Sequence, residues 1–504
     1  MYFGSAIKSF KGPLLVVLFL ALGLVTLALQ APSAKTPGTG KAQQAGPKIG
    51  FLGSPLLLPG EISRRFPQGN SMVFLATDAQ SFSPVGPPVP LAPQFFAVAG
   101  PQVSFDGSRI LFAGQKEKGA TWQIWEMALD GAAPRPITHC TSDCLQPAYL
   151  PRDQIVYTAF TGTGPQRSSA IYVCQRDGTK AHPITFGPGN FQVETVLRSG
   201  RVLVSAASPL LAGGTGGNGW GHRALYLVRP DGSGLGLFRQ DATMDPISTG
   251  AEELDNGAVL FVQGRGAVVP QPIGGGLAWV PQGALRPVQL TAPPSLYESA
   301  RELHAGTLIV SRQTPGLSAA DRTFDLYTFD LASQTLGKRL YHQAKLSSIS
   351  PFVIAPHPAP LYYPSILHLE EKTGRVLCLN SYVSADAPHG RIATPIAQVR
   401  VVALEQGGRE QTLGNAPVEK DGSFYIKVPA DTPIRFALLD AKGRVIRAQK
   451  SWIWARPGED RGCLGCHEDQ ALAPENHWPL TLSRFDTPTP VGVPAQPQEK
   501  HPEQ

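Results

Sequence analysis

The sequence predicts a mainly β fold, in which a six- or seven-bladed β-propeller precedes a small β-sandwich and a short C-terminal segment. Three observations lead to this prediction. The 504 residues include 53 glycines and 48 prolines while only 16% are charged, which favours short strands joined by turns. A turn-and-strand motif recurs roughly every 50 residues through most of the chain. Beyond residue 365 the strands lengthen, with turns about ten residues apart.

The N-terminus carries an export signal. An apolar run over residues 13–29 follows Lys8 and Lys11, and positive charge before such a run is typical of a secretion signal or membrane anchor. We expect residues 1–34 to be an uncleaved anchor in the inner membrane, because no clean small-x-small cleavage site follows; a cleaved signal is the alternative. Both place the body of the chain in the periplasm or another extracytoplasmic space. Residues 35–50 are expected to form a flexible linker.

The predicted propeller, residues 51–365, contains two repeated half-motifs. One is a tight turn before a β-rich run, as in Phe105-Asp106-Gly107 before residues 109–112. The other is a strand that ends in Asp-Gly and is followed by a tail such as Pro-Ile-Thr. Asp-Gly supplies the positive φ of hairpin turns, and two hairpins per repeat are the signature of a propeller blade. The repeats resemble those of periplasmic Tol-type propellers, a resemblance that implies a fold rather than an activity.

Charge and motif content exclude several functions. The formal net charge is +6 without a long basic run, so nucleic-acid binding is not expected. Neither Gly-x-Ser-x-Gly nor His-Glu-x-x-His occurs, so a hydrolase has no sequence support. Residues 214–219 match Gly-x-Gly-x-x-Gly, but a predicted strand follows them, and we interpret them as a loop. Cys140 and Cys144 could form a small disulfide in an exported chain; two buried thiols are the alternative.

The second β domain, residues 366–450, is predicted to be a transthyretin-like sandwich. Its strands alternate in polarity, and the hairpin at Asp421-Gly422-Ser423-Phe424 is typical of such sandwiches. We expect it to act as a spacer that holds the C-terminal segment on the propeller. A binding role is the alternative.

The most specific chemical signal is Cys463-Leu464-Gly465-Cys466-His467, which has the Cys-x-x-Cys-His pattern of c-type haem attachment. Cys463 and Cys466 are predicted to bind one haem c covalently, with His467 as the proximal ligand to the iron. The other four cysteines cannot form a second such motif. We therefore expect residues 451–484 to form a haem segment and residues 485–504, rich in Pro and Gln, a disordered tail.

The ligand on the other side of the iron decides between electron transfer and substrate chemistry. The four methionines lie far from the haem segment in sequence. His477 is the first candidate, because the ten residues after His467 span roughly 30 Å when extended. His389, in the sandwich, is the second candidate. The third alternative is an iron whose second axial position is open or bound by water.

Four further side chains are predicted to contact the haem. Trp452 and Trp454 alternate along one strand end, and we expect one of them to pack on the porphyrin; sandwich core is the alternative. Arg456 and Arg461 are candidates to pair with the haem propionates, with solvated charges as the alternative.

The chain resembles a known family over most of its exported part, including the propeller and Ser381-Tyr382, and most specifically from Val418 to Glu468. The runs Val-Pro-Ala-Asp-Thr-Pro, Leu-Leu-Asp, Ser-Trp, Pro-Gly-Glu and Cys-x-Gly-Cys-His-Glu, between Val418 and Glu468, look like the C-terminal part of proteins related to the hydrazine synthase alpha subunit. The resemblance implies a propeller joined to a C-terminal domain whose haem transfers electrons. The synthase also carries a second, catalytic haem site. Because this chain has one haem motif, the resemblance does not imply hydrazine synthesis.

These inferences predict an extracytoplasmic, monohaem, c-type cytochrome-like protein that carries single electrons and docks a redox partner protein on its propeller. No catalytic residue is predicted, and whether the protein is an enzyme stays open. One alternative is a haem enzyme with an open axial site that acts on a small nitrogen or oxygen species. The other is a propeller scaffold or binding protein whose haem is structural.

Overall fold

The computed structural model covers the predicted propeller and sandwich. The chain divides into residues 1–43 and 44–504, and the predicted anchor lies outside the described residues. Within the part that the structure describes, no helix is long and apolar enough to cross a membrane. The described residues are 46–79, 81–162, 167–207, 223–238, 248–264, 273–284, 286–292, 294–314, 322–384, 387–405, 408–449, 451–465, 478–484 and 487–494.

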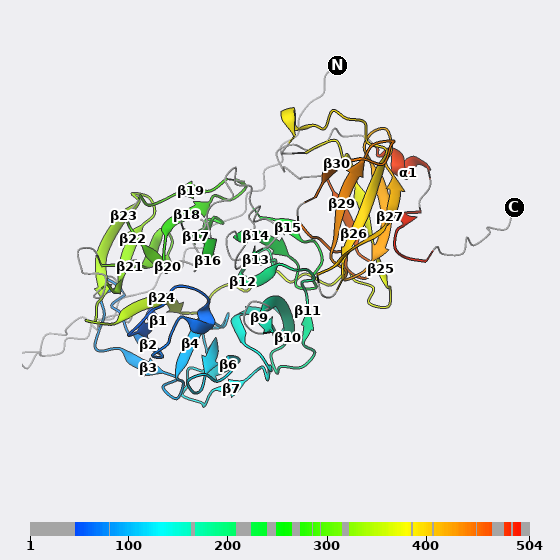
Figure 1. Ribbon diagram of the computed structural model, residues 1–504. Helices are drawn as coiled ribbons and strands as arrows, with labels where there is room; N and C mark the ends of the chain where they lie inside the picture. The colour runs from blue at the N-terminus through cyan, green and yellow to red at the C-terminus, as the bar shows by residue number, and fades with distance from the viewer. Residues whose placement is uncertain are drawn as a thin grey trace, which may run out of the picture. The chain divides into compact units, whose positions relative to one another are not determined.

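The described strands form eight four-stranded sheets, and six of these are the blades of a β-propeller (Figure 1). In chain order the blades are β24-β1-β2-β3, β4-β5-β6-β7, β8-β9-β10-β11, β12-β13-β14-β15, β16-β17-β18-β19 and β20-β21-β22-β23. The strand bounds are β1 (Lys48–Ser54), β2 (Ser71–Leu75), β3 (Val89–Leu91), β4 (Ala97–Val103), β5 (Arg109–Gln115), β6 (Gln123–Ala128), β7 (Arg135–Pro136), β8 (Cys144–Leu150), β9 (Gln154–Thr161), β10 (Ser168–Gln175), β11 (His182–Pro183), β12 (Asn190–Val196), β13 (Val202–Ala207), β14 (Arg223–Val228), β15 (Gly236–Leu237), β16 (Ser248–Glu253), β17 (Val259–Gln263), β18 (Gly276–Val280), β19 (Val288–Gln289), β20 (Tyr297–His304), β21 (Thr307–Gln313), β22 (Phe324–Asp330), β23 (Thr335–Tyr341) and β24 (Ser347–Ile354).

The propeller closes on itself. Strand β24, the last of the propeller, pairs antiparallel with β1, the first, so that both ends of the tract share one blade. The innermost strands β4, β8, β12, β16, β20 and β24 also contact one another in an unbroken cycle. This closure leaves no open edge between the first and last blades, and it fixes the blade number at six, within the predicted range.

The repeated Pro-Ile-Thr tail has a structural explanation. Ile184 is fully buried, and the Thr185 hydroxyl accepts a hydrogen bond from the Ile171 N–H at 2.9 Å. Gly232, in the Asp-Gly turn of the next blade, has φ 85° and approaches so closely that an added Cβ would lie 2.7 Å from the Ile184 carbonyl oxygen. This tail therefore fits under the next blade's turn, which only glycine can form there. The same arrangement occurs one blade earlier at Ile137, Thr138 and Gly178.

Every innermost strand of the propeller also carries a β-bulge. The pairing register shifts once along each of β4, β8, β12 and β16, twice along β20, and once where β1 pairs with β24. Glutamates join some of these bulges to the next blade: Glu194 accepts the Gly250 N–H at 2.9 Å, and Glu298 accepts the Ser350 N–H at 3.0 Å. Bulges bend and twist strands, so the repeated defect lets six strands converge on one axis.

The short loop between β7 and β8 contains a disulfide. Cys140 and Cys144 are bonded to each other, with their Cα atoms 6.5 Å apart. The structure thus supports the disulfide reading over two separate thiols. The bond closes the loop that leads into the innermost strand of the next blade.

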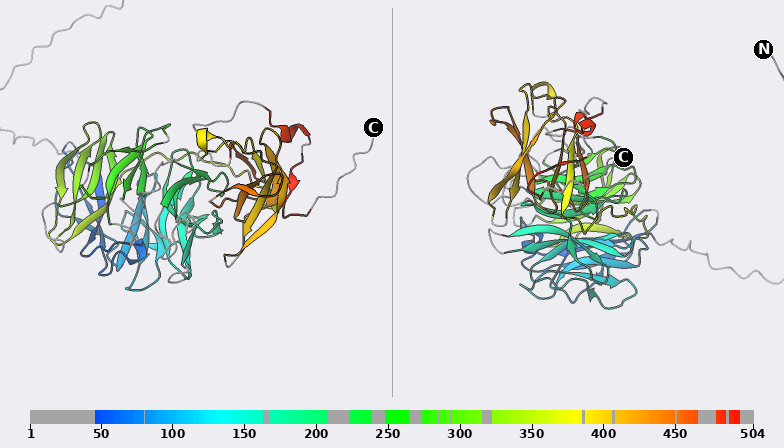
Figure 2. Two further views of the ribbon diagram at one scale, coloured as in Figure 1. Left: turned by 45° about the horizontal axis from the view of Figure 1, so that its top comes forward. Right: turned by 90° about the vertical axis from the view of Figure 1, so that its right-hand side faces the viewer.

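The remaining two sheets pack face to face as a β-sandwich (Figure 2). One sheet has the order β31-β25-β28-β32 and the other β27-β26-β29-β30. Alternate residues of both sheets, such as Val376, Val399, Ile426 and Ile434, are fully buried between them. The element bounds are β25 (Thr373–Cys378), β26 (Gln398–Leu404), β27 (Glu410–Pro417), β28 (Phe424–Pro429), β29 (Ile434–Leu439), β30 (Val445–Ala448), β31 (Asp460–Cys463), β32 (Thr489–Pro490), the helix α1 (Leu480–Arg484) and the 3-10 turns Ile62–Arg64 and Pro388–Gly390.

Three predicted boundaries are wrong. The predicted linker, residues 35–50, already contains the start of β1. The predicted haem segment does not stand apart from the sandwich, because β31 pairs in parallel with β25. Strand β32 lies in the predicted disordered tail, yet it pairs with β28, and Val491 beside it is buried in the sandwich core. A two-residue strand pairing and one buried apolar side chain hold the tail there, and composition does not reveal so short a segment.

The propeller also contains a carboxylate that should make its stability depend on pH. Glu252 on β16 faces Arg301 at 3.6 Å and accepts the Glu302 N–H at 3.3 Å, while 20% of its side chain is exposed. Burial raises the pKa of Glu252 to about 7, with Arg301 acting in the opposite direction and the Glu302 carboxylate adding to the rise.

The raised pKa of Glu252 favours the protonated carboxyl in the folded state. Its stabilising contribution is therefore full below pH 4.5 and is lost as the pH rises through about 7, amounting to roughly 3 kcal/mol at most. We expect Glu252→Gln to remove this loss, so that the variant gains stability over the wild type between pH 5 and pH 8. Thermal unfolding over that range measures the difference, with exposed Glu370→Gln as control. Parallel profiles for wild type and Glu252→Gln would contradict the prediction.

Candidate haem-attachment site

The first cysteine of the motif ends an edge strand of the sandwich. Strand β31 runs parallel to β25, with Cys463 in register with Cys378, and the Leu379 N–H donates to the Cys463 carbonyl oxygen at 2.9 Å. Cys378 is only 1% exposed and belongs to the sandwich core, whereas Cys463 is half-buried at its margin. Of these two neighbouring thiols, Cys463 is therefore the one placed to react with an external group.

The other parts of the motif are only partly described. Cys466, His467 and the candidate distal ligand His477 lie outside the described residues. Gly465 is described, and it lies directly on Val383: an added Cβ would be 2.5 Å from the Val383 carbonyl oxygen. A side chain at position 465 would therefore push the attachment segment away from the sandwich.

The loop that follows β25 lies against this segment. Val383 makes an isolated antiparallel bridge with Arg391, and the Ser384 N–H donates to the Gly390 carbonyl oxygen at 2.9 Å. The Tyr382 hydroxyl accepts the Ile396 N–H at 3.0 Å, which ties the loop to the start of β26. The loop between β25 and β26 is therefore cross-linked along its length and lies against the attachment segment.

Trp454 has a different position from the predicted one. It is 1% exposed and packs between Phe186 and Phe191 of the propeller, with ring centroids 5.9 and 5.7 Å away. Its indole N–H donates to the Gly232 carbonyl oxygen at 3.0 Å. Trp454 thus joins the sandwich to two blades, and the contacts in the structure give no support to its prediction as a porphyrin contact.

The two arginines predicted to bind propionates contact the propeller as well. Arg456 donates to the Pro183 carbonyl oxygen at 3.3 Å and faces Asp431 at 3.3 Å. Arg461 donates to the Leu235 carbonyl oxygen at 2.5 Å. Burial lowers the pKa of Arg456 and raises that of Asp431, while the attraction between the two opposes both shifts. The prediction for both arginines has no support here, because propeller carbonyl groups occupy their guanidinium groups.

Glu459 completes this junction, and the sequence reasoning missed its role. It is 3% exposed, and its carboxylate accepts the Arg456 N–H at 2.7 Å and the Gly234 N–H at 2.8 Å. Glu459 therefore bonds the sandwich backbone to the propeller backbone. Arg456 and Arg461 flank Glu459 in sequence, so a local ion pair was the simpler interpretation, and no local signal pointed to the Gly234 N–H as its partner. Trp452, by contrast, stays in the sandwich, 7% exposed, with the Arg435 guanidinium 5.1 Å from its ring.

The described half of the site fits a covalently attached haem. The Leu480 N–H donates to Asp421 and the Thr481 N–H donates to Ser423, which holds the start of α1 on the turn before β28, whose first residue pairs with Cys378. Trp478, just before this helix, is 70% exposed. A porphyrin is a large apolar group, and an exposed tryptophan offers such a group a surface of matching chemistry. Among the described residues, no cluster of three or more His, Cys, Asp or Glu side chains could hold a metal ion by itself.

Fold and site together define a six-bladed propeller protein whose β-sandwich carries a Cys-x-x-Cys-His segment. Residues 375–468 match the family model described as the hydrazine synthase alpha subunit middle domain. Over this domain the chain is similar to the hydrazine synthase alpha subunit. A curated relative, hydrazine synthase subunit alpha of Kuenenia stuttgartiensis, is 31% identical over 96 residues, a match that spans 17% of this chain and only 12% of the relative.

The structural comparison extends the likeness to the propeller. The solved Kuenenia stuttgartiensis hydrazine synthase superimposes with a TM-score of 0.73 at 18% identity, over 87% of this chain and 71% of that chain. This likeness shows the fold. A putative TolB from Agrobacterium tumefaciens gives a TM-score of 0.35 at 14% identity, over 49% of this chain and 90% of that chain, too low to support an inference.

One sequence expectation needs correction at this point. The resemblance was placed in the C-terminal part of the family's proteins, where the haem transfers electrons. The matched family model describes the middle domain of the subunit. The family resemblance therefore gives no argument for electron transfer here, and that role has to be argued from this chain's own residues.

Proposed function

We propose that this chain is an exported c-type haem protein that transfers single electrons. The observation that carries the proposal is the position of Cys463, half-buried at the end of an edge strand that is bonded to the sandwich. Cys463 and Cys466 would hold the haem through thioether bonds, and His467 would bind the iron from one side. When bound, the haem supplies a centre that gains or loses one electron at a time.

The rigid support of β31 favours electron transfer. Arg461 bonds to the propeller within the strand, Glu459 does so just before it, and the Leu379 N–H holds the Cys463 carbonyl. A fixed attachment point limits the rearrangement that accompanies a change in charge. The exported location rests on the N-terminal sequence, and cell fractionation of the full-length chain tests it. A partner protein that exchanges the electron is part of the proposal.

Covalent haem is tested with the full-length protein, produced by a host that exports it and attaches c-type haem. We expect a haem stain to persist on a denaturing gel for the wild type and to vanish for Cys463→Ser/Cys466→Ser. Cys174→Ala is the matched control, since Cys174 is a buried cysteine of a propeller blade and its variant should keep the stain. A wild type without covalent haem, or a double variant that retains it, would overturn the proposal.

A second candidate function is a haem enzyme with an open iron position, acting on a small nitrogen or oxygen species. It is favoured by the match of the motif-bearing domain to that of a synthase subunit. Carbon monoxide separates the two candidates. An absorption spectrum that is indifferent to carbon monoxide supports the electron carrier, whereas a shift on its addition supports the enzyme.

A further inference from the structure

A second histidine, His389, lies near the haem-attachment segment in space, although it precedes Cys463 by 74 residues in the chain. His389 is the middle residue of the 3-10 turn Pro388–Gly390, in the loop between β25 and β26. The turn is closed by hydrogen bonds from the Gly390 N–H to the Ala387 carbonyl oxygen at 2.9 Å and from the Arg391 N–H to that of Pro388 at 3.2 Å.

The loop brings this turn to the motif. Arg391, two residues after His389, bridges to Val383, and the Val383 carbonyl oxygen lies against Gly465, which directly precedes Cys466. The Ser384 N–H bond to the Gly390 carbonyl oxygen holds the other side of the turn. Two backbone contacts therefore link His389 to the segment that would carry the haem, and neither depends on a flexible side chain.

The backbone of His389 has an unusual conformation, and its side chain has no partner among the described residues. Its backbone lies in the left-handed region, with φ 55° and ψ 25°, where non-glycine residues are uncommon. The imidazole is exposed, and it makes no hydrogen bond or ion pair with any residue in the part of the chain that the structure describes. Strained residues held by their surroundings cluster at ligand-binding positions. A histidine presented in this way has an imidazole nitrogen available to an external group.

Other described histidines are less suitable. His342 pairs with Asp325 at 3.0 Å and His357 lies 3.1 Å from the Val103 carbonyl oxygen, both within the propeller. His368 contacts Gly458, in the turn before β31, whereas Cys463 is the last residue of that strand. The strand β31 alone, Asp460–Cys463, separates its two ends by about 10 Å.

We propose that His389 is the second axial ligand of the haem iron. This inference rests on the proposed function, because it needs the haem that Cys463 would hold. It deepens that function by giving the iron six ligands, with imidazole on both sides, and so no open position for a substrate. Bis-histidine ligation of this kind suits an electron carrier.

The test compares the spin state of the purified full-length holoprotein with that of His389→Asn. Asparagine tolerates the left-handed region, so the turn is kept while the imidazole is removed. We expect a low-spin wild type that ignores carbon monoxide, and a variant that is high-spin, binds carbon monoxide and still carries stained covalent haem. Added imidazole should restore the low-spin spectrum of the variant. His368→Asn is the matched control and should behave as the wild type.

The possible results distinguish a wrong assignment of His389 from a wrong proposal of covalent haem. A low-spin spectrum unchanged in His389→Asn, with covalent haem retained, overturns the assignment of His389 and leaves the haem protein standing. A high-spin change in His477→Asn, with none in His389→Asn, assigns the position to His477. A high-spin wild type that binds carbon monoxide overturns the six-ligand iron. A wild type without covalent haem overturns both proposals.

Discussion

Replacing Trp454 by alanine is expected to lower the free energy of unfolding by about 3–5 kcal/mol and to loosen the sandwich from the propeller. The indole is 1% exposed, lies edge-to-face with Phe186 and Phe191, and bonds to the Gly232 carbonyl oxygen. Alanine would leave a cavity between two blades and deprive that buried carbonyl of its donor. Thermal and guanidinium unfolding measure the loss, and hydrogen exchange locates it.

The Trp454→Ala result has a specific spatial signature. Exchange should quicken around Gly232 and in β31 while the distant blades stay protected. Leu369→Ala is the control, since its side chain is 68% exposed and its loss should change stability by less than about 0.5 kcal/mol. If Trp454→Ala unfolds like the wild type, or if exchange quickens evenly throughout the propeller, the junction does not depend on this residue.

The blades could be predicted because their signal is local and repeated. Asp-Gly turns and Pro-Ile-Thr tails each make a characteristic contact that recurs in successive blades. The Thr185 hydroxyl, for example, accepts the Ile171 N–H, and Thr138 accepts the Ile124 N–H one blade earlier. The number of blades could not be fixed in the same way. Strands from both ends of the tract, β1 and β24, share one blade, so dividing the tract by its period leaves the count open by one.

The haem motif was readable because its chemistry lies in five consecutive residues. The side chains around it were not, because their partners are far away in sequence. Trp454 bonds to a carbonyl 222 residues earlier, and Arg461 to one 226 residues earlier. Nothing local distinguishes an aromatic or a guanidinium aimed at a porphyrin from one aimed at a neighbouring domain. The loop under the motif was missed for the same reason, since Val383 meets Gly465 only through the parallel pairing of β25 and β31.

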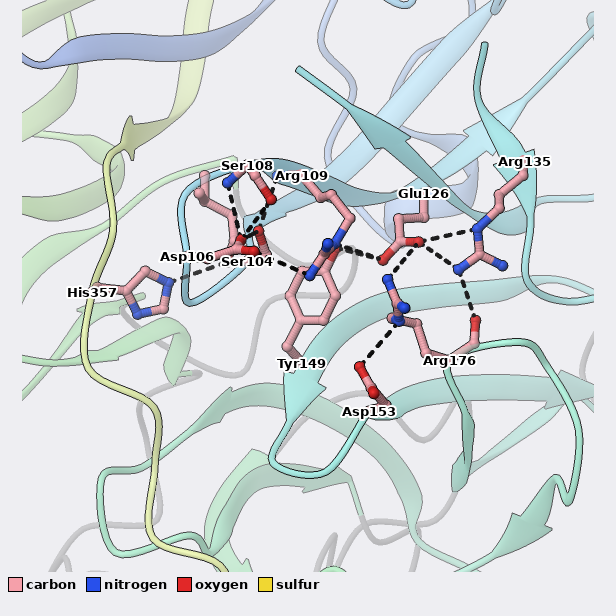
Figure 3. A network of polar contacts seen from close by, with 11 residues as sticks. Ser104, Asp106, Ser108, Arg109, Glu126, Arg135, Tyr149, Asp153, Arg176 and His357 are labelled. Carbon is pink, nitrogen blue, oxygen red and sulfur yellow. Dashed lines mark hydrogen bonds and ion pairs between the residues drawn. The ribbon is translucent and has the colours of Figure 1, made fainter. Parts of the chain in front are cut away.

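A buried carboxylate between two blades gives the second large prediction. Glu126 on β6 is 3% exposed; it accepts the Tyr149 hydroxyl at 3.0 Å and two bonds from Arg135 at 2.5 and 3.1 Å (Figure 3). Arg109 and Arg176 approach it at 3.6 and 3.7 Å. Three of these residues belong to one blade, while Tyr149 and Arg176 belong to the next, so the carboxylate holds the two blades together.

Glu126→Ala is expected to lower the free energy of unfolding by about 3–5 kcal/mol, because three guanidinium groups would face one another without their shared carboxylate. Glu126→Gln keeps the shape and an acceptor oxygen but loses the charge, so it should cost less. Glu405, whose side chain is 32% exposed and pairs with the 79% exposed Arg409 four residues on, is the control, and its alanine variant should cost no more than about 0.5 kcal/mol. Guanidinium unfolding at low and high salt measures all three. A Glu126→Ala loss as small as that of Glu405→Ala would mean that the arginines find other partners and that packing alone holds these blades.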